Sequence, residues 1–165
     1  MFRGTHRPRH PARFWIAVWC LASLVLWTAG CITSAMRPPP GARGIVVPMT
    51  VTGYCNCGVC CSWESTWFGL GSPVISAGPR KGVVKKIGFT SSGTEARHGT
   101  IAADVSRYPY GTLMEVPGYG TGRVEDTGGA IKGDHIDLWF DDHDQARQWG
   151  RQRKMVKIWL SYGGR

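Results

Sequence analysis

Short runs of β-branched and apolar residues, separated by Gly, Pro and Asp, make up most of the sequence after residue 44. Such runs, broken by turn residues, are typical of a small β-barrel or β-sandwich. The runs cover residues 45–54, 99–103, 112–116, 122–125, 136–140 and 154–160. One helix is expected over residues 142–151, which has acids in its first turn and arginines further along. The sequence therefore predicts a mainly β domain with one short helix near the C-terminus.

Three aspartates lie within these strand-like runs or at their ends: Asp104, Asp126 and Asp137. A carboxylate in such a position loses hydration, which is costly unless it has partners or a function. Any one of them alone is explained by a strand or turn cap, because Asp is common in turns. Three together favour a functional site.

The first 36 residues have the pattern of an export signal. Residues 14–36 carry no charge and are rich in Trp, Leu, Val and Ala, and four arginines precede them. Residues 28–31, Thr-Ala-Gly-Cys, resemble the lipobox of bacterial lipoproteins, which predicts lipidation of Cys31. Two alternatives stay open: cleavage after small residues near Ala35, or an uncleaved anchor, since the run is long enough to cross a hydrocarbon core of ~30 Å as a helix.

All three alternatives place the rest of the chain outside the cytoplasm, with the positive N-terminal flank inside. The lipoprotein and the uncleaved anchor, in that order of preference, also hold it to the membrane, on the extracytoplasmic (periplasmic) side. Residues 37–44 are a Pro- and Gly-rich linker, because proline runs favour extended polyproline geometry. The folded domain is expected over residues 45–165.

The formal net charge of +9 permits a nucleic-acid partner, but many of the cations cluster at the two ends of the chain. The first cluster belongs to the export signal. The acids are concentrated between Asp104 and Asp144, and no nucleic-acid-binding motif is present. Nucleic acid is therefore not expected as a partner.

Four of the six cysteines gather in one block: Cys55, Cys57, Cys60 and Cys61. Two disulfides are expected, because thiols outside the cytoplasm are normally oxidised. Pairs within 55/57 or within 60/61 would close small strained rings, so the bonds are expected to cross between the two groups. Zinc is the alternative, but the block is too compact to close a four-cysteine site alone, and no metal is predicted. A nucleophilic cysteine is disfavoured, since crowded thiols there oxidise.

Six motifs follow one another along residues 51–160: VTGYC (51–55), TSSGT (90–94), GTIAAD (99–104), YPYGT (108–112), VEDTGGAIKG (124–133) and IDLWF (136–140). In this order they resemble the motifs of the three-aspartate (3D) domain. This domain occurs in membrane-bound lytic transglycosylase A and in stationary-phase survival and resuscitation proteins of bacteria. The resemblance implies a six-stranded double-psi β-barrel and a peptidoglycan glycan strand as partner, with no cofactor.

The resemblance also implies a reaction: cleavage between N-acetylmuramic acid and N-acetylglucosamine without water, leaving a 1,6-anhydro end. By motif, Asp137 corresponds to the catalytic acid, and Asp104 and Asp126 to its supporting carboxylates. Asp137 would protonate the glycosidic oxygen and then accept the proton of the sugar's C6 hydroxyl. It must therefore stay protonated above the usual aspartate pKa of about 3.9, through burial and repulsion by its two neighbours.

Five further residues are candidates for substrate binding: Thr52, Thr94, Gly128, Gly129 and Lys132. The glycine pair lets the backbone approach the sugar, and the threonine hydroxyls can hydrogen-bond it. Lys132 can equally pair with Asp126 or Asp134, and this structural role is preferred.

Aromatic residues and one histidine are further candidates. Trp63, Trp67 and Phe68 suit either a sugar-stacking platform or core packing. His135 shares a strand face with Asp137, which permits a proton-relay or metal role, although a structural role is preferred.

Two features depart from the family pattern. Residues 62–86 match none of its motifs, and the second domain that forms the substrate groove in membrane-bound lytic transglycosylase A has no counterpart here. The groove is then either open or completed by a partner, such as a second copy in a homodimer.

The competing hypothesis is a non-catalytic module that binds cell-wall polysaccharide, since fold does not determine function. The presence of all three aspartates favours the enzyme.

Overall fold

The computed structural model describes residues 36–67 and 69–161. The predicted export signal with Cys31 lies outside these residues, except for Met36. Within the described ranges, no helix has the length and apolar character needed to cross a membrane.

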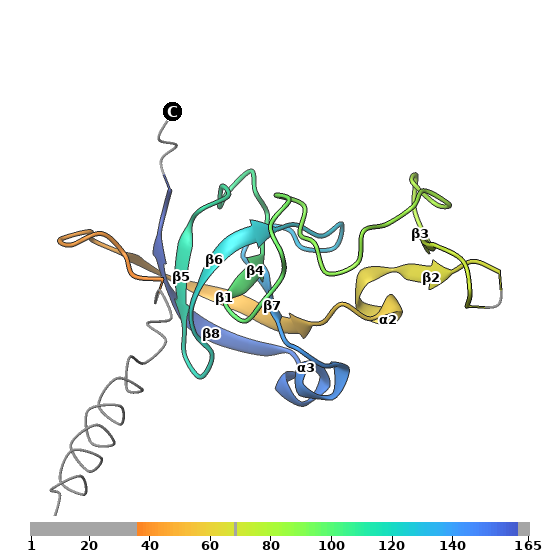
Figure 1. Cartoon of the computed structure of the whole chain (residues 1–165). Helices are drawn as coiled ribbons and strands as arrows, with labels where there is room; N and C mark the ends of the chain where they lie inside the picture. Colours follow the sequence, from red (N-terminus) through yellow and green to blue (C-terminus); the bar gives the residue numbers. More distant parts are fainter. Residues whose placement is uncertain (1–35, 68, 162–165) are drawn as a thin grey trace, which may run out of the picture. The chain divides into compact units, whose positions relative to one another are not determined.

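Six strands form a closed barrel, in the order β1-β7-β4-β6-β5-β8 (Figure 1). The β1·β7 and β4·β6 pairs are parallel, and the other pairs are antiparallel. The expected strand runs and the observed strands differ at their ends by at most two residues, which confirms the mainly β, six-stranded prediction. The strands are β1 (Ile45–Tyr54), β4 (Thr100–Ala102), β5 (Leu113–Val116), β6 (Gly120–Asp126), β7 (His135–Trp139) and β8 (Gln152–Trp159).

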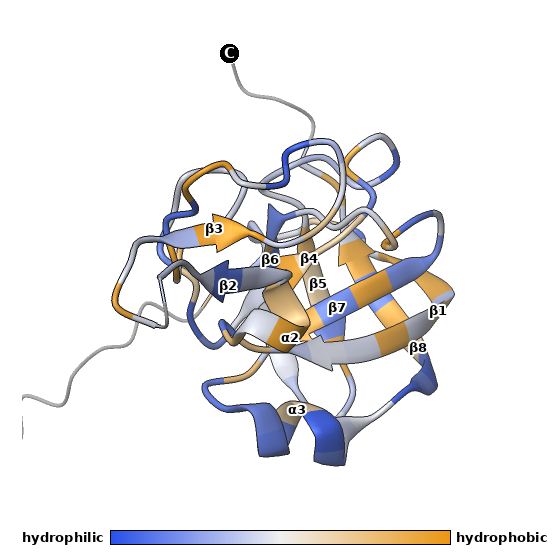
Figure 2. Cartoon of the chain, turned by 90° about the vertical axis from the view of Figure 1, so that its right-hand side faces the viewer, coloured by the Kyte–Doolittle hydropathy of each residue, from blue (hydrophilic) through white to orange (hydrophobic). Residues whose placement is uncertain are grey.

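The barrel interior is filled by alternate residues of these strands. Apolar segments alternate with polar ones along β7 and β8 (Figure 2), as expected when successive side chains point to opposite faces. In β7, for example, Ile136 and Leu138 are fully buried and the intervening Asp137 is not. The largest fully buried side chains are Met49, Ile101, Met114, Ile136, Leu138 and Ile158.

Residues 55–98 leave the barrel between β1 and β4. They contain α2 (Gly58–Cys61) and a small antiparallel sheet of β2 (Trp63–Ser65) and β3 (Pro73–Ile75), which lie beyond the end of β1 (Figure 1). Sequence analysis assigned no element to residues 62–86. Core packing is wrong for Trp67, which is 75% exposed, and Phe68 lies outside the described residues.

Helix α3 (His143–Trp149) confirms the expected helix with slightly shorter ends. Asp142 is its N-cap and accepts a hydrogen bond from the Gln145 backbone N–H at 2.9 Å. Ala146 is buried, and Trp149 packs on the barrel core. The helix thus packs against the barrel through Ala146 and Trp149.

Two methionines allow a matched test of the core. Met114 is fully buried and Met155 is 57% exposed, so the same substitution removes the same atoms from different surroundings. Met114→Ala is expected to lower the free energy of unfolding by about 2–5 kcal/mol. Met155→Ala should change it by less than about 0.5 kcal/mol. Urea unfolding followed by tryptophan fluorescence measures both, and equal effects would contradict this core.

Candidate active site

A row of paired residues across four strands builds the site. Thr52 of β1 pairs with Asp137 of β7, and Asp137 pairs on its other side with Ala102 of β4. Ala102 pairs in turn with Asp126 of β6. Residues directly opposite each other project from the same face of a sheet. Since the neighbours Val51, Ile101, Ile136 and Leu138 are buried in the core, this row lies on the outer face of the barrel.

A register shift determines which acid joins the row. Between Ile101 and Ala102 the pairing with β6 moves by one extra residue, so that Asp126 lies opposite Ala102 and Glu125 is passed over. Glu125 is buried and accepts a hydrogen bond from the Thr100 hydroxyl at 3.0 Å. Irregular pairing of this kind commonly re-aims a side chain near a functional site.

The row opens into a cleft of about 580 Å³. Asp126, Asp137 and the Gly128-Gly129 pair line its barrel side. Residues 55–98, here called the wall segment, supply much of the rest, including Trp63 and Phe89. The wall segment also brings cations that sequence analysis did not single out: Arg80, Lys85 and Lys86. The cleft therefore combines carboxylates, aromatic rings and positive charge.

Asp137 is the carboxyl group with a raised pKa. Burial raises the pKa of Asp137 to about 6, and the charge of Asp126 adds to the effect. A hydrogen bond from the Thr52 hydroxyl to Asp137 Oδ1, at 2.8 Å, opposes it in part. Burial and repulsion by Asp126 are thus present, as expected from the sequence, whereas the expected repulsion by Asp104 is not among the causes. Asp137 thus holds a proton at mildly acidic pH inside the cleft.

Thr52 links Asp137 to His135. The Thr52 hydroxyl lies 3.0 Å from His135 Nε2 and has a single proton, which it donates to Asp137. Burial, assisted by Arg151, lowers the pKa of His135 and favours its neutral form, and a hydrogen bond with the Ala130 backbone opposes this shift. The hydroxyl predicted to bind sugar is instead engaged within the protein.

Asp126 is held by three donors. The Tyr54 hydroxyl donates to Oδ2 at 3.0 Å, and the backbone N–H groups of Ser91 and Thr127 donate to Oδ1 at 2.9 Å each. Burial, followed by the Asp126 charge, raises the pKa of Tyr54 well above its usual value, so the phenol keeps its proton. These contacts fix the orientation of Asp126 beside Asp137.

Asp104 lies outside the cleft. It accepts hydrogen bonds from the Ser106 hydroxyl and from the Gly133 backbone N–H at 2.9 Å, and these lower the pKa of Asp104 to about 2. Its contact with Gly133 anchors the loop between β6 and β7. Repulsion from Asp104 is not among the causes that raise the pKa of Asp137. The structure thus brings together Asp126 and Asp137 and places Asp104 outside the cleft, at the base of a loop.

The two glycines of the cleft differ. A Cβ on Gly128 would lie 2.9 Å from Ile131 Cγ1, so packing against Ile131 requires glycine there. A Cβ on Gly129 would meet nothing within 4 Å, so its surroundings are open. Gly129 is therefore the glycine whose backbone a ligand can approach.

Two other substrate-binding candidates lie outside the cleft. The Thr94 hydroxyl contacts that of Thr90 at 2.9 Å, and it is Thr90 that lines the cleft. The Lys132–Asp134 pair is not formed, because Asp134 pairs with Arg107 at 3.1 Å. The charge of Lys132 acts on Asp104 instead.

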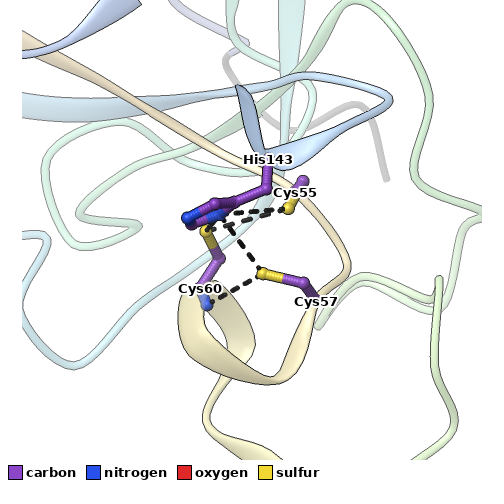
Figure 3. Close-up of side chains that lie close together, drawn as sticks. All are labelled: Cys55, Cys57, Cys60 and His143. Atoms are coloured by element: carbon purple, nitrogen blue, oxygen red, sulfur yellow. Dashed lines mark hydrogen bonds between the residues drawn. The ribbon is translucent and has the colours of Figure 1, made fainter. Parts of the chain in front are cut away.

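The two disulfides expected in the cysteine block are absent: all four thiols are free in the structure. Cys55 Sγ and Cys60 Sγ lie 3.8 Å apart, well beyond a disulfide bond of ~2.05 Å. Cys55, Cys57 and Cys60 converge on His143 (Figure 3), and these four residues could hold a metal ion. Sequence analysis did not find this set, because His143 lies more than 80 residues away from the cysteines.

Two relatives match less than half of this chain. Two proteins of Bacillus subtilis (strain 168) are each 36% identical over 75 residues, or 43% of this chain. One is named "Putative cell wall shaping protein YabE", and the other is named "Cell wall-binding protein YocH". The matched parts make up 18% and 26% of those proteins, so the chain spans a minor part of their length.

Among solved structures, MltA from E. coli matches 42% of this chain and 26% of its own, with a TM-score of 0.36 and 25% identity. The same protein with bound chitohexaose matches equal shares, with a TM-score of 0.37 and 20% identity. The family model of the 3D domain matches residues 99–161. The chain is therefore similar to the 3D domain over residues 99–161, and the matched residues include Asp104, Asp126 and Asp137.

Proposed function

We propose that this chain is an extracytoplasmic lytic transglycosylase acting on peptidoglycan. It cleaves the β-1,4 bond between N-acetylmuramic acid and N-acetylglucosamine without water and leaves a 1,6-anhydro end. The observation that carries the proposal is Asp137, a carboxyl group in a cleft with a pKa of about 6 beside a second carboxylate. A general acid needs a pKa near the working pH.

In the proposed reaction, protonated Asp137 gives its proton to the glycosidic oxygen as the bond from that oxygen to C1 breaks. The Asp137 carboxylate then takes the proton of the muramic acid C6 hydroxyl, whose oxygen attacks C1. The anhydro bond forms and Asp137 is again protonated, so one residue serves as acid and then as base. Hydrolytic glycosidases need a second catalytic carboxylate at a defined separation for water or for a covalent intermediate.

Asp126 supports this chemistry electrostatically. Its oriented charge favours the positively charged, oxocarbenium-like transition state and disfavours ionisation of Asp137 in the free cleft. The two effects act in the same direction for the first step. Asp126 therefore contributes through its charge, with no proton transfer of its own.

Three further observations support a glycan substrate outside the cytoplasm. The residues similar to the 3D domain include both cleft carboxylates, and the chain's relatives include proteins named for cell wall shaping and cell wall binding. Aromatic rings and cations of the wall segment suit sugar rings and acidic stem peptides.

We include in the proposal a double-psi connection of the barrel, and export through residues 1–36 with lipidation at Cys31.

A non-catalytic module that binds cell-wall polysaccharide is the second candidate. The cell wall-binding name of YocH favours it. The two candidates agree on the ligand and differ only in whether the glycosidic bond breaks.

The first test replaces the proposed acid. The full-length chain, Asp137→Asn and Asp144→Asn are each incubated with purified peptidoglycan, and soluble products are analysed by mass spectrometry. Asp137→Asn is expected to lower anhydro-muropeptide release by about 10²–10⁴-fold, because it removes general acid–base catalysis. Asp144, whose side chain is 93% exposed on α3, is the matched control and should behave as the unchanged chain.

The other outcomes distinguish the candidates. Reducing-end products would indicate hydrolysis. Sedimentation with the sacculus but no soluble product would favour the binding module. Equal activity of Asp137→Asn and the unchanged chain would exclude Asp137 as the acid.

The second test concerns pH. Activity needs protonated Asp137, so it should fall as the pH rises through about 6. Asp126→Asn removes a charge that raises the pKa of Asp137, so this alkaline limb should move to lower pH. Asp104→Asn should leave the position of the limb unchanged, whatever its effect on the overall rate. An equal shift in both variants, measured as initial rate against pH, would contradict the arrangement described above.

A further inference from the structure

Three thiols and one imidazole converge at the point where the chain leaves the barrel after β1. Cys55, Cys57 and Cys60 each have their sulfur within 3.9 Å of His143 Nδ1, and the four ligand atoms all lie within 4.8 Å of one another (Figure 3). We propose that Cys55, Cys57, Cys60 and His143 bind a structural zinc ion. This site does not rest on the proposed function, and it contains none of the cleft carboxylates.

The distances match a tetrahedral zinc site. Zn–S bonds of ~2.3 Å and a Zn–N bond of ~2.0 Å at tetrahedral angles separate two sulfurs by ~3.8 Å, and a sulfur from the nitrogen by ~3.5 Å. Cys55 Sγ and Cys60 Sγ are 3.8 Å apart. His143 Nδ1 lies 3.5 Å from the sulfurs of Cys57 and Cys60, and 3.9 Å from that of Cys55. Four protein ligands close the site, as in structural zinc centres.

The local backbone is arranged for thiolate ligands. Cys57 and Cys60 form a Cys-x-x-Cys turn at the start of α2, where the Cys60 backbone N–H donates to Cys57 Sγ at 3.4 Å. A donor directed at the sulfur stabilises its anionic form, which is the form that binds zinc. The cysteine block is too compact to supply all four ligands of a zinc site. It supplies three, and His143 of α3 is the fourth.

Cys61 is separate from this set. Its thiol donates to the Cys55 backbone carbonyl at 3.1 Å and does not belong to the four converging groups. It is therefore the matched control for the three ligand cysteines.

The wall segment supplies a physical reason for a metal ion. Its apolar side chains include Trp67, Leu70 and Val84, which are 75%, 82% and 66% exposed, so this segment has little hydrophobic core of its own. Small units that cannot bury enough apolar surface are commonly held by a metal or by disulfides. The ion would join the end of β1, α2 and α3, and so set where the wall of the cleft begins.

Metal analysis of the full-length chain tests the proposal. The protein is purified in detergent from zinc-supplemented cells and assayed by plasma mass spectrometry, together with Cys57→Ser, His143→Ala and Cys61→Ser. We expect about one zinc per chain in the unchanged protein and in Cys61→Ser, and at least a fivefold loss in the other two variants. Removal of zinc from the unchanged protein by a chelator should expose about three additional reactive thiols and lower the melting temperature.

Measurements on the unchanged protein keep the test decisive even where a variant fails to fold. Cobalt substitution should give the visible absorption of a tetrahedral thiolate site, which Cys61→Ser retains. Absence of zinc and cobalt binding by the unchanged protein would overturn the proposal. So would disulfides involving Cys55, Cys57 or Cys60 in peptide mass spectra, or an equal loss of zinc in Cys61→Ser and Cys57→Ser.

Discussion

The candidate active site depends on how one very short strand is held between two others. β4 has three residues, all buried, and its central residue Ile101 packs in the barrel core while pairing with Val124 on one side and Leu138 on the other. The next residue, Ala102, faces outward and has an aspartate as its partner on each side. The packing of Ile101 in the barrel core thus fixes β4 and, with it, the positions of Asp137 on β7 and Asp126 on β6, which lie on either side of Ala102 on the outer face of the barrel.

The two carboxylates differ because their hydrogen-bond partners differ. Asp126 accepts hydrogen bonds from two backbone N–H groups and a phenol, whereas Asp137 accepts one from the Thr52 hydroxyl and has a pKa that burial raises. Burial with few donors disfavours the charged form of a carboxyl group. The wall segment affects both carboxylates, because it encloses the cleft that contains Asp137 and also supplies the Ser91 N–H to Asp126. Where this segment is anchored is therefore relevant to the electrostatics of the barrel surface.

The barrel strands could be predicted from the sequence because each is a short run of β-branched and apolar residues bounded by Gly, Pro or Asp, and these are local features. Helix α3 could be predicted because the acids of its first turn and the arginines further along are also local features. Sequence analysis did not place Asp104, Thr94 or Lys132 correctly relative to the cleft, since these depend on loop contacts between distant residues. His143 was not found for the same reason: its cysteine partners precede it by a long stretch of chain that only the fold brings close.

The register shift beside Glu125 also has a consequence for the length of β6. Had the strands paired without it, Glu125 would stand opposite Ala102, and a longer acid with other partners would face the cleft. Deleting or inserting one residue in β6 next to Glu125 would change which acid lies opposite Ala102, because a slip of one residue moves side chains to the other face of the sheet. The site therefore depends on the length of β6 as well as on the identity of its residues.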